Sequence, residues 1–201
     1  MDYRFDADSH RYWINEREVP SVTRVLADLI PGWKASEWYL ERGQAVHAAA
    51  AFIAKGIDFE CDARIAGQVT AVRRFFAEVK PVVLAVELKV YSHTYQYAGT
   101  LDLAASIPTT KTAPVPIIWD YKASLTPATP YQMAAYSQSL KETKGQNVDR
   151  GIGVEIREDG TYHMSEVYDL KRYRQKWLTL LGAYHIRREC GIKEETQGET
   201  Q

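Results

Sequence analysis

Residues 86–124 read VELKVYSHTYQYAGTLDLAASIPTTKTAPVPIIWDYKAS and contain three runs with the alternation of β-strands. Successive side chains of a strand point to opposite faces, so residues two apart share a face. The apolar positions are Leu84, Val86, Leu88 and Val90 in the first run, Leu101 and Leu103 in the second, and Ile117, Trp119 and Tyr121 in the third. The pattern predicts three neighbouring strands whose apolar sides share one core.

Charged side chains occupy the other side of these runs, namely Glu87, Asp102, Asp120 and Lys122. If the apolar sides face one core, these four residues gather on the opposite face of the sheet. Three carboxylates close together repel one another, so they are normally paired with cations or hold a metal ion. Carboxylate oxygens suit Mg²⁺ or Mn²⁺ better than Zn²⁺. The sequence therefore predicts a divalent metal site, with a salt-bridge network that includes Lys89 as the alternative.

The length and composition of the chain indicate which class of protein it belongs to. The chain has 201 residues, of which 45% are hydrophobic and 25% are charged, enough for one sizeable globular domain. Its first ten residues, MDYRFDADSH, are charged, and no later run has the length of a membrane span, so we expect a soluble intracellular protein. Cys61 and Cys190 are the only cysteines, too few for a four-cysteine iron–sulfur cluster, and we expect both to be reduced. A net charge of −1 gives no overall attraction to nucleic acid, so any binding of nucleic acid must depend on local clusters of positive charge.

The rest of the chain predicts helices around this central stretch. The predicted helices begin at Ser21, near residue 36, near residue 62, at Thr129 and at Asp169. The predicted hairpins pair Tyr3–Phe5 with Arg11–Ile14 and Gly151–Ile156 with Thr161–Val167. We therefore predict an α/β (α+β) fold with a central mixed five-stranded sheet flanked by helices.

Four short motifs occur in a fixed order along residues 36–140. They are Arg42-Gly43-Gln44-Ala45-Val46-His47, Gly99-Thr100-Leu101-Asp102, Asp120-Tyr121-Lys122, and Gln132-Met133-Ala134-Ala135-Tyr136. The ordered set resembles the RecB-like branch of the PD-(D/E)xK nucleases. The N-terminal pattern His10-x-Tyr12 followed by residues 19–26, VPSVTRVL, is similar to phage-type and mitochondrial genome-maintenance exonucleases of that branch. The chain departs from the branch at Ala51, where many members have a glutamate one turn after the histidine.

The resemblance implies a restriction-endonuclease-like core and a deoxyribonuclease that uses one or two Mg²⁺ or Mn²⁺ ions. Asp102 and Asp120 are then metal ligands, together with the main-chain carbonyl of Tyr121. Glu87 contributes directly or through water, and His47 takes a manganese position. The ammonium of Lys122 positions the attacking water or stabilises the pentacovalent phosphorus.

The resemblance also implies contacts with DNA. Gln132 and Tyr136 orient the catalytic lysine or contact the DNA backbone. Arg42 either anchors its helix or binds phosphate. The basic residues that start the last helix, Lys171, Arg172 and Arg174, form either a phosphate track or a solvated helix face.

From these observations we expect one nuclease domain over residues 1–192. It consists of an N-terminal hairpin and helix (1–35), a catalytic core (36–168) and a C-terminal basic helix (169–192), followed by a disordered tail (193–201). The expected activity is a DNA exonuclease that leaves 5′-phosphate products, in recombination, repair or DNA processing in the cytoplasm of a bacterial or phage-infected cell. The alternatives are a structure-specific endonuclease and a non-catalytic nucleic-acid-binding subunit of a recombination complex. A single-strand annealing or recombination protein is a candidate partner.

Overall fold

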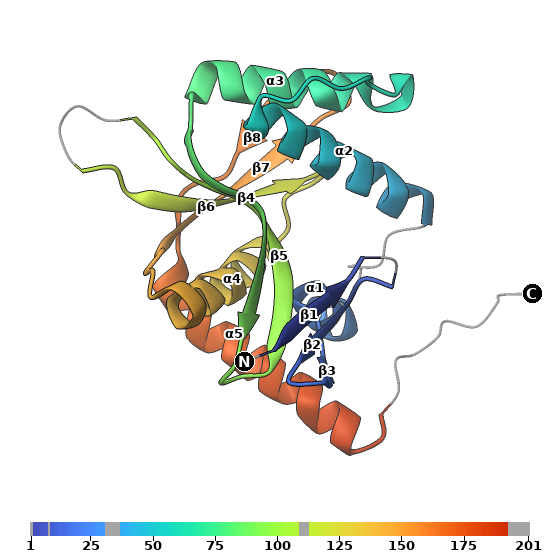
Figure 1. Cartoon of the computed structure of the whole chain (residues 1–201), viewed down its shortest axis with the longest axis vertical. Coiled ribbons are helices and arrows are strands. Elements are labelled where there is room, and N and C mark those ends of the chain that lie inside the picture. The colour runs from blue at the N-terminus through green and yellow to red at the C-terminus, as the bar shows by residue number, and fades with distance from the viewer. Residues whose placement is uncertain (1, 8, 31–36, 109–112, 193–201) are drawn as a thin grey trace, which may run out of the picture.

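A mixed β-sheet with helices on both of its faces forms the body of the protein in the computed structural model (Figure 1). The structure describes residues 2–7, 9–30, 37–108 and 113–192, so the predicted tail 193–201 lies outside the described residues. None of the described helices is long and apolar enough to cross a membrane.

The main sheet has six strands in the order β4-β5-β6-β7-β8, with β9 also paired to β7. The strands are β4 (Val82–Ser92), β5 (Tyr97–Ser106), β6 (Pro116–Lys122), β7 (Arg150–Ile156), β8 (Tyr162–Met164) and β9 (Tyr168–Asp169). β6 and β7 are parallel, and the other pairs are antiparallel. The predicted mixed sheet is confirmed, but it has six strands rather than five.

The extra strand arises at Ser165, where the predicted second arm of the last hairpin is interrupted. The main-chain N–H of Gly153 donates to the hydroxyl of Ser165 at 3.0 Å instead of to a main-chain carbonyl. The ladder between β7 and β8 therefore ends at Met164, and the chain returns to β7 as β9, where Arg150 pairs with Asp169.

Two helices cover each face of the sheet. One face carries α2 (Glu37–Lys55) and α3 (Ala66–Val79), and a 3-10 turn (Ala63–Ile65) precedes α3. The other face carries α4 (Thr129–Lys144) and α5 (Leu170–Glu189), and α1 (Val22–Leu29) lies beside α5. The predicted caps Ser21 and Asp169 are confirmed, because their side chains accept the N–H groups of Arg24 and Lys171. α4 begins one residue earlier than predicted, because Ala128 and not Thr129 is its N-cap.

Because both faces of the sheet are covered, the expectation of a single apolar face is wrong. Ile117, Trp119 and Tyr121 share the core under α2 and α3, as their spacing predicts, but Ile118 lies in the core under α4 and α5. In β5, Leu101 lies in the α4/α5 core and Leu103 in the α2/α3 core. A regular strand would place these two leucines on the same face, so the alternation breaks at Asp102.

The same break occurs in the neighbouring strand. Val86 packs against the α2/α3 core and Leu88 against the α4/α5 core. Between them, Glu87 has a φ of 49°, in the left-handed region that non-glycine residues seldom adopt. Two acidic side chains therefore occupy the points where β4 and β5 change face.

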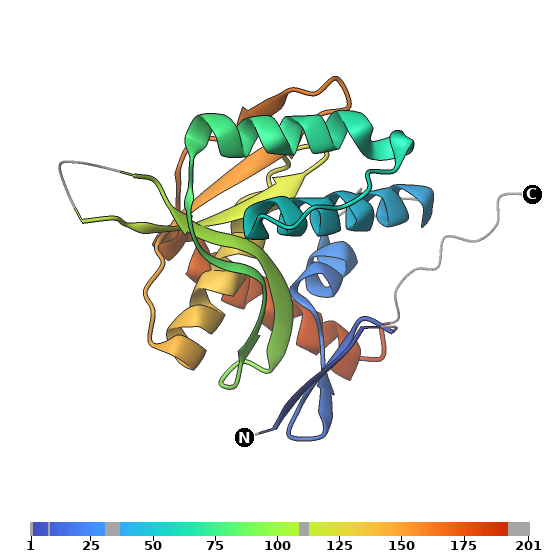
Figure 2. The ribbon, with the colours of Figure 1, turned by 45° about the horizontal axis from the view of Figure 1, so that its top comes forward.

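A small three-stranded sheet packs on the far end of the β4–β5 hairpin (Figure 2). It comprises β1 (Tyr3–Asp6), β2 (Arg11–Ile14) and β3 (Arg17–Val19) in antiparallel order β1-β2-β3. The rings of Tyr3 and Tyr91 stack at 4.6 Å, and Ala98 donates its N–H to the carbonyl of Pro20. The predicted N-terminal hairpin is confirmed, and β3 extends it.

Candidate metal centre

Asp102 lies at the centre of the site, buried between β5 and β6. The printed pairing of these two strands runs from Ser106 with Pro116 to Leu103 with Trp119. Beyond that point, the main-chain N–H of Tyr121 donates to Asp102 Oδ2 at 2.9 Å. The other oxygen, Oδ1, lies 3.1 Å from Nδ1 of His47, which α2 presents. A carboxylate therefore takes a position that a main-chain carbonyl would hold in a continued ladder.

Three potential ligands converge at this point from three different elements. His47 of α2, Glu87 of β4 and Asp102 of β5 each offer one ligand atom, and these atoms all lie within 4.8 Å of one another. One imidazole nitrogen and two carboxylates form a donor set that suits Mn²⁺ and, through the oxygens, Mg²⁺. The unusual backbone at Glu87 and the end of the β5–β6 ladder at Asp102 both contribute to this convergence.

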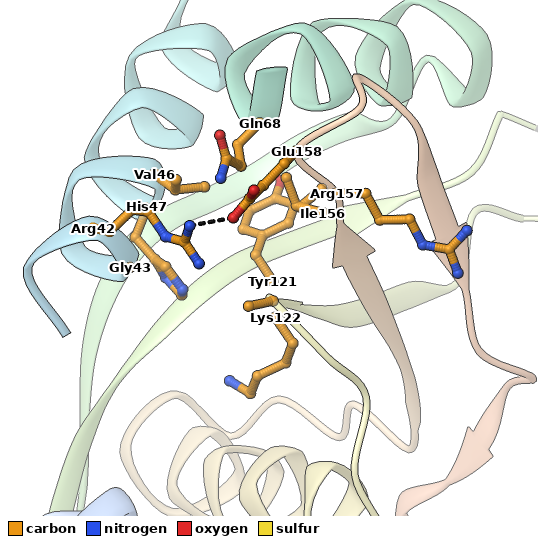
Figure 3. A pocket seen from close by; sticks show the side chains of 11 residues that line it. Arg42, Gly43, Val46, His47, Gln68, Tyr121, Lys122, Ile156, Arg157 and Glu158 are labelled. Atoms are coloured by element: carbon orange, nitrogen blue, oxygen red, sulfur yellow. Dashed lines mark hydrogen bonds and ion pairs between the residues drawn. The ribbon is translucent and has the colours of Figure 1, made fainter. Parts of the chain in front are cut away.

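Asp120 and Lys122 lie beside these three residues rather than among them. Asp120 is fully buried, and its Oδ2 lies 2.7 Å from Nζ of Lys122. Apart from this ion pair, neither oxygen of Asp120 has a hydrogen-bond partner among the described residues. In Figure 3 the Lys122 side chain extends away from the ring of Tyr121, toward the side of the sheet that carries α4. The charged residues of β6 thus face away from the core that holds Tyr121.

The pKa shifts of these groups indicate an excess of negative charge in a buried place. Burial, and then the nearby charge of Asp102, raise the pKa of Glu87. Burial also raises the pKa of Asp120 to about 6, although Lys122 acts in the opposite direction. Burial opposes the charged forms of Asp102 and His47 too, but their mutual attraction lowers the pKa of Asp102 and raises that of His47. A divalent cation at this position would relieve the repulsion among the carboxylates.

The raised pKa of Asp120 predicts that Asp120→Asn stabilises the metal-free protein in a pH-dependent way. The carboxyl titrates near pH 4 in the unfolded chain and at about 6 in the fold. Its ionisation therefore destabilises the fold progressively as the pH rises from 4 to 6, by roughly 2–3 kcal/mol above that range. In EDTA at pH 7.5, the melting temperature of the variant should rise by roughly 5 °C.

At pH 4.5 this gain should shrink to roughly a third, because the carboxyl is then protonated in the fold and is largely ionised only in the unfolded chain. Asp58→Asn, a change at an exposed aspartate, is the control and should show no such pH dependence. An equal gain at both pH values would contradict the assignment of the shift to Asp120.

Gln132 and Tyr136 of α4 form a buried polar pair near the acids. The side-chain amide of Gln132 donates to the hydroxyl of Tyr136 at 3.0 Å. Tyr136 lies within electrostatic range of Asp120 and Asp102, which, after burial, contribute to a pKa well above its ordinary value. A Cβ atom at Gly99 would lie 2.7 Å from the Tyr136 ring. The ring can therefore occupy this position only because the Gly-Thr motif has a residue without a side chain there. The orienting role of the pair stays a prediction.

A pocket of about 420 Å³ opens beside His47 and Lys122 (Figure 3). Its lining residues are Arg42, Gly43, Val46, His47, Gln68, Tyr121, Lys122, Ala123, Ile156, Arg157 and Glu158. Arg42 of α2 reaches across and forms an ion pair with Glu158, in the turn between β7 and β8. The Arg-Gly-x-x-x-His helix and the end of β6 thus form two walls of one pocket.

The turn that carries Glu158 is held against α3 by a close contact at Gly67. A Cβ atom at this position would lie 2.7 Å from the carbonyl carbon of Glu158 and closer still to its oxygen. Gly67→Ala should therefore displace the turn and lower the free energy of unfolding by about 1–3 kcal/mol. Urea denaturation checks this, with Gly182→Ala as the control because nothing lies within 4 Å of a Cβ there. Equal stability of the two variants would refute the contact.

The basic start of α5 has two kinds of residues. Arg174 is half-buried, and its guanidinium pairs with Asp149 and donates to the hydroxyl of Ser137. This arginine therefore joins α5 to α4 and to the start of β7. Lys171 and Arg172 are exposed, although Lys171 also lies 3.2 Å from Asp149. A phosphate track on this helix, which remains a prediction, would depend on Lys171 and Arg172 more than on Arg174.

Sequence reasoning missed the contribution of the β7–β8 turn. Arg157 and Glu158 lie between the two arms of a predicted hairpin, and neither they nor Gln68 belong to a motif that the sequence shows. Their positions depend on how α2, α3 and the turn pack together. A local sequence pattern cannot show that arrangement.

Fold and site together define an α/β protein with a candidate divalent metal centre at one end of its sheet. No family model and no curated protein matches the sequence. Among solved structures the chain is similar to an alkaline exonuclease (LHK-Exo) from Laribacter hongkongensis, with 13% identity, a TM-score of 0.43, and coverage of 86% of this chain and 88% of the other. A complex of LHK-Exo with dAMP gives 14% identity, a TM-score of 0.46, and coverage of 87% and 89%.

Proposed function

We propose that this protein is a Mg²⁺- or Mn²⁺-dependent deoxyribonuclease that hydrolyses phosphodiester bonds. The observation that carries the proposal is the convergence of His47, Glu87 and Asp102 within 4.8 Å, with the Asp120–Lys122 pair beside them. Acidic ligands can hold the divalent ion of a metal-assisted phosphodiester hydrolysis, and a lysine beside them can stabilise the charge that develops on the phosphate. A surface salt-bridge network does not account for this site, because Asp102 and Asp120 are buried.

The residues present fit a divalent ion. The site combines the one nitrogen and two carboxylates of the three converging ligands with Asp120, whose oxygens have no donor among the described residues apart from the ammonium of Lys122. When bound, such an ion supplies charge neutralisation on the phosphate and lowers the pKa of water. Despite burial, the neighbouring carboxylate of Asp102 raises the pKa of His47 and so favours its protonated form, and binding of an ion to this imidazole should release that proton. The main-chain carbonyl of Tyr121 remains a candidate ligand.

Lys122 supplies the fixed positive charge of the reaction. Its ammonium is held by Asp120 and is mostly shielded from solvent, with 18% of the side chain exposed. A cation in this position stabilises negative charge as it develops on the non-bridging oxygens, or orients the attacking water. Hydrolysis with departure of the 3′-oxygen leaves a 5′-phosphate on the product.

The pocket beside the site supports an exonuclease rather than an endonuclease. Its volume of about 420 Å³ is of the order of one nucleotide, and Arg42, Lys122 and Arg157 line it, each already paired with a carboxylate. A terminal nucleotide could enter such a pocket, which would place the last phosphodiester bond near the acids.

The test compares linear and circular DNA. Purified protein is incubated with 5′- or 3′-labelled linear DNA and with closed circular DNA, in Mg²⁺, Mn²⁺ or EDTA. The proposal expects metal-dependent release of 5′-mononucleotides from linear DNA and no cutting of circles. Cutting of circles would make the protein an endonuclease. Binding of DNA without cleavage in any metal would make it a nucleic-acid-binding subunit of a recombination complex, and the proposal would fail.

A further inference from the structure

Next to the candidate metal centre, the β4–β5 hairpin carries a second set of polar groups. Lys89 of β4 pairs in register with Thr100 of β5. Each lies two residues along its strand from an acidic residue of the site, Lys89 from Glu87 and Thr100 from Asp102. Two residues of a regular strand span roughly 6.6 Å, so Lys89 and Thr100 lie close enough to the acidic residues for one nucleic acid strand to reach both sets of groups.

The N-terminal sheet packs directly on this pair of residues. Phe5 of β1 and Tyr12 of β2 are partners in register. The hydroxyl of Tyr12 lies 3.0 Å from that of Thr100, and Nζ of Lys89 lies 4.6 Å from the centre of the Phe5 ring. The ring of Phe5 in turn contacts His10 edge to face. The hairpin thus fixes both residues of the Lys89–Thr100 pair from the same side.

No carboxylate lies within ion-pair distance of the Lys89 ammonium among the described residues, although the charges of Glu87 and Asp102 act on it from farther away. Its closest described side-chain contact is the ring of Phe5. A half-buried lysine normally has a carboxylate partner, because burial without one costs free energy. Here the ammonium is positioned by an aromatic ring and remains available to an anion.

We propose that Lys89, held by Phe5 of the N-terminal hairpin, binds the backbone phosphate next to the one that is hydrolysed. This inference rests on the proposed nuclease function and extends it to the N-terminal sheet, which then forms one wall of the substrate site. His47, Glu87 and Asp102 would hold an ion that attracts the scissile phosphate, and Lys89 would fix the position of the strand one nucleotide away. The hydroxyl of Thr100 and the exposed ring of His10 lie where they can contact the same strand.

The experiment measures Lys89→Met, which keeps the packing on Phe5 but removes the charge. In Mn²⁺, the variant should raise KM for a short linear DNA by about tenfold and leave kcat within about twofold of the wild type. The slope of log KM against log salt concentration should fall by about one, as expected for one lost phosphate contact. Lys89→Arg should restore both values in large part. Lys141→Ala, which removes an exposed charge on α4, is the matched control and should change neither.

A modified substrate identifies the phosphate. Two substrates carry one neutral methylphosphonate each, on one or the other side of the scissile bond; the wild type and Lys89→Met should cleave one of them equally well, and the other should keep the full difference between the two proteins. If Lys89 only compensates the charge of Glu87 and Asp102, the variant will change Mn²⁺ affinity and leave the salt slope unchanged, and the inference is overturned. A wild-type protein that neither binds nor cleaves DNA would refute the proposed function itself, whereas cleavage with unchanged KM in the variant would refute only the role of Lys89.

Discussion

Asp102→Asn should reduce metal-dependent DNA cleavage by at least roughly 10³-fold, because this one carboxylate connects the parts of the site. Its Oδ1 faces His47, its Oδ2 accepts the N–H of Tyr121, and it lies within ligand distance of Glu87. An asparagine can occupy the same space, but it presents a neutral oxygen and a donor in place of two anionic oxygens. Steady-state cleavage of linear DNA measures the loss, and isothermal titration with Mn²⁺ shows whether it follows from weaker metal binding.

The control is Asp58→Asn at an exposed position beyond the end of α2, which should retain full activity. Circular dichroism should show the same secondary structure for both variants. Cleavage by Asp102→Asn within tenfold of the wild-type rate would exclude the site described above as the catalytic centre.

Lys122→Met should reduce kcat by roughly 10²–10³-fold while the protein still binds Mn²⁺. The two effects separate because Lys122 neutralises Asp120 but is not itself a metal ligand. Removal of the ammonium leaves an extra negative charge near Asp102, so affinity for the cation should stay the same or increase. A parallel loss of metal binding and activity would assign Lys122 a purely structural role.

Lys122→Arg provides the matched comparison for that variant. An arginine keeps the positive charge but spreads it over a larger planar group, so it should restore the pairing with Asp120 better than the activity. If Lys122→Arg and Lys122→Met lose activity equally, the position of the charge matters more than its presence.

Much of the fold could be predicted because the chain is locally regular. The cap residues Ser21 and Asp169 set the starts of two helices, and the alternation in residues 116–122 correctly placed Trp119 and Tyr121 in one core. The acidic residues were identified because charge interrupts that alternation. Pattern alone could not show that the sheet is covered on both faces. Leu101 and Leu103 look equivalent in the sequence, yet they enter different cores.

The candidate site was predicted in part for a similar reason. The sequence predicts metal ligands that include His47, Glu87 and Asp102, and the ligand atoms of these three residues converge in the structure. Asp120, which is also predicted as a ligand, lies beside them and pairs with Lys122. Glu158 and the N-terminal hairpin reach the site only through tertiary packing. Lys89 was visible in the sequence, but as part of a salt-bridge network, because its contact with Phe5 joins residues more than eighty positions apart.

The left-handed backbone at Glu87 has a consequence for any attempt to make this protein more robust. Glycine at that position would relieve the steric conflict, and Glu87→Gly should raise the melting temperature of the metal-free protein even as it removes one of the three converging carboxylate and imidazole groups. Selection for heat tolerance alone would therefore favour inactive variants at this residue. Thermostability and turnover must be screened together, because the variant with the least backbone strain at this position is expected to lack activity.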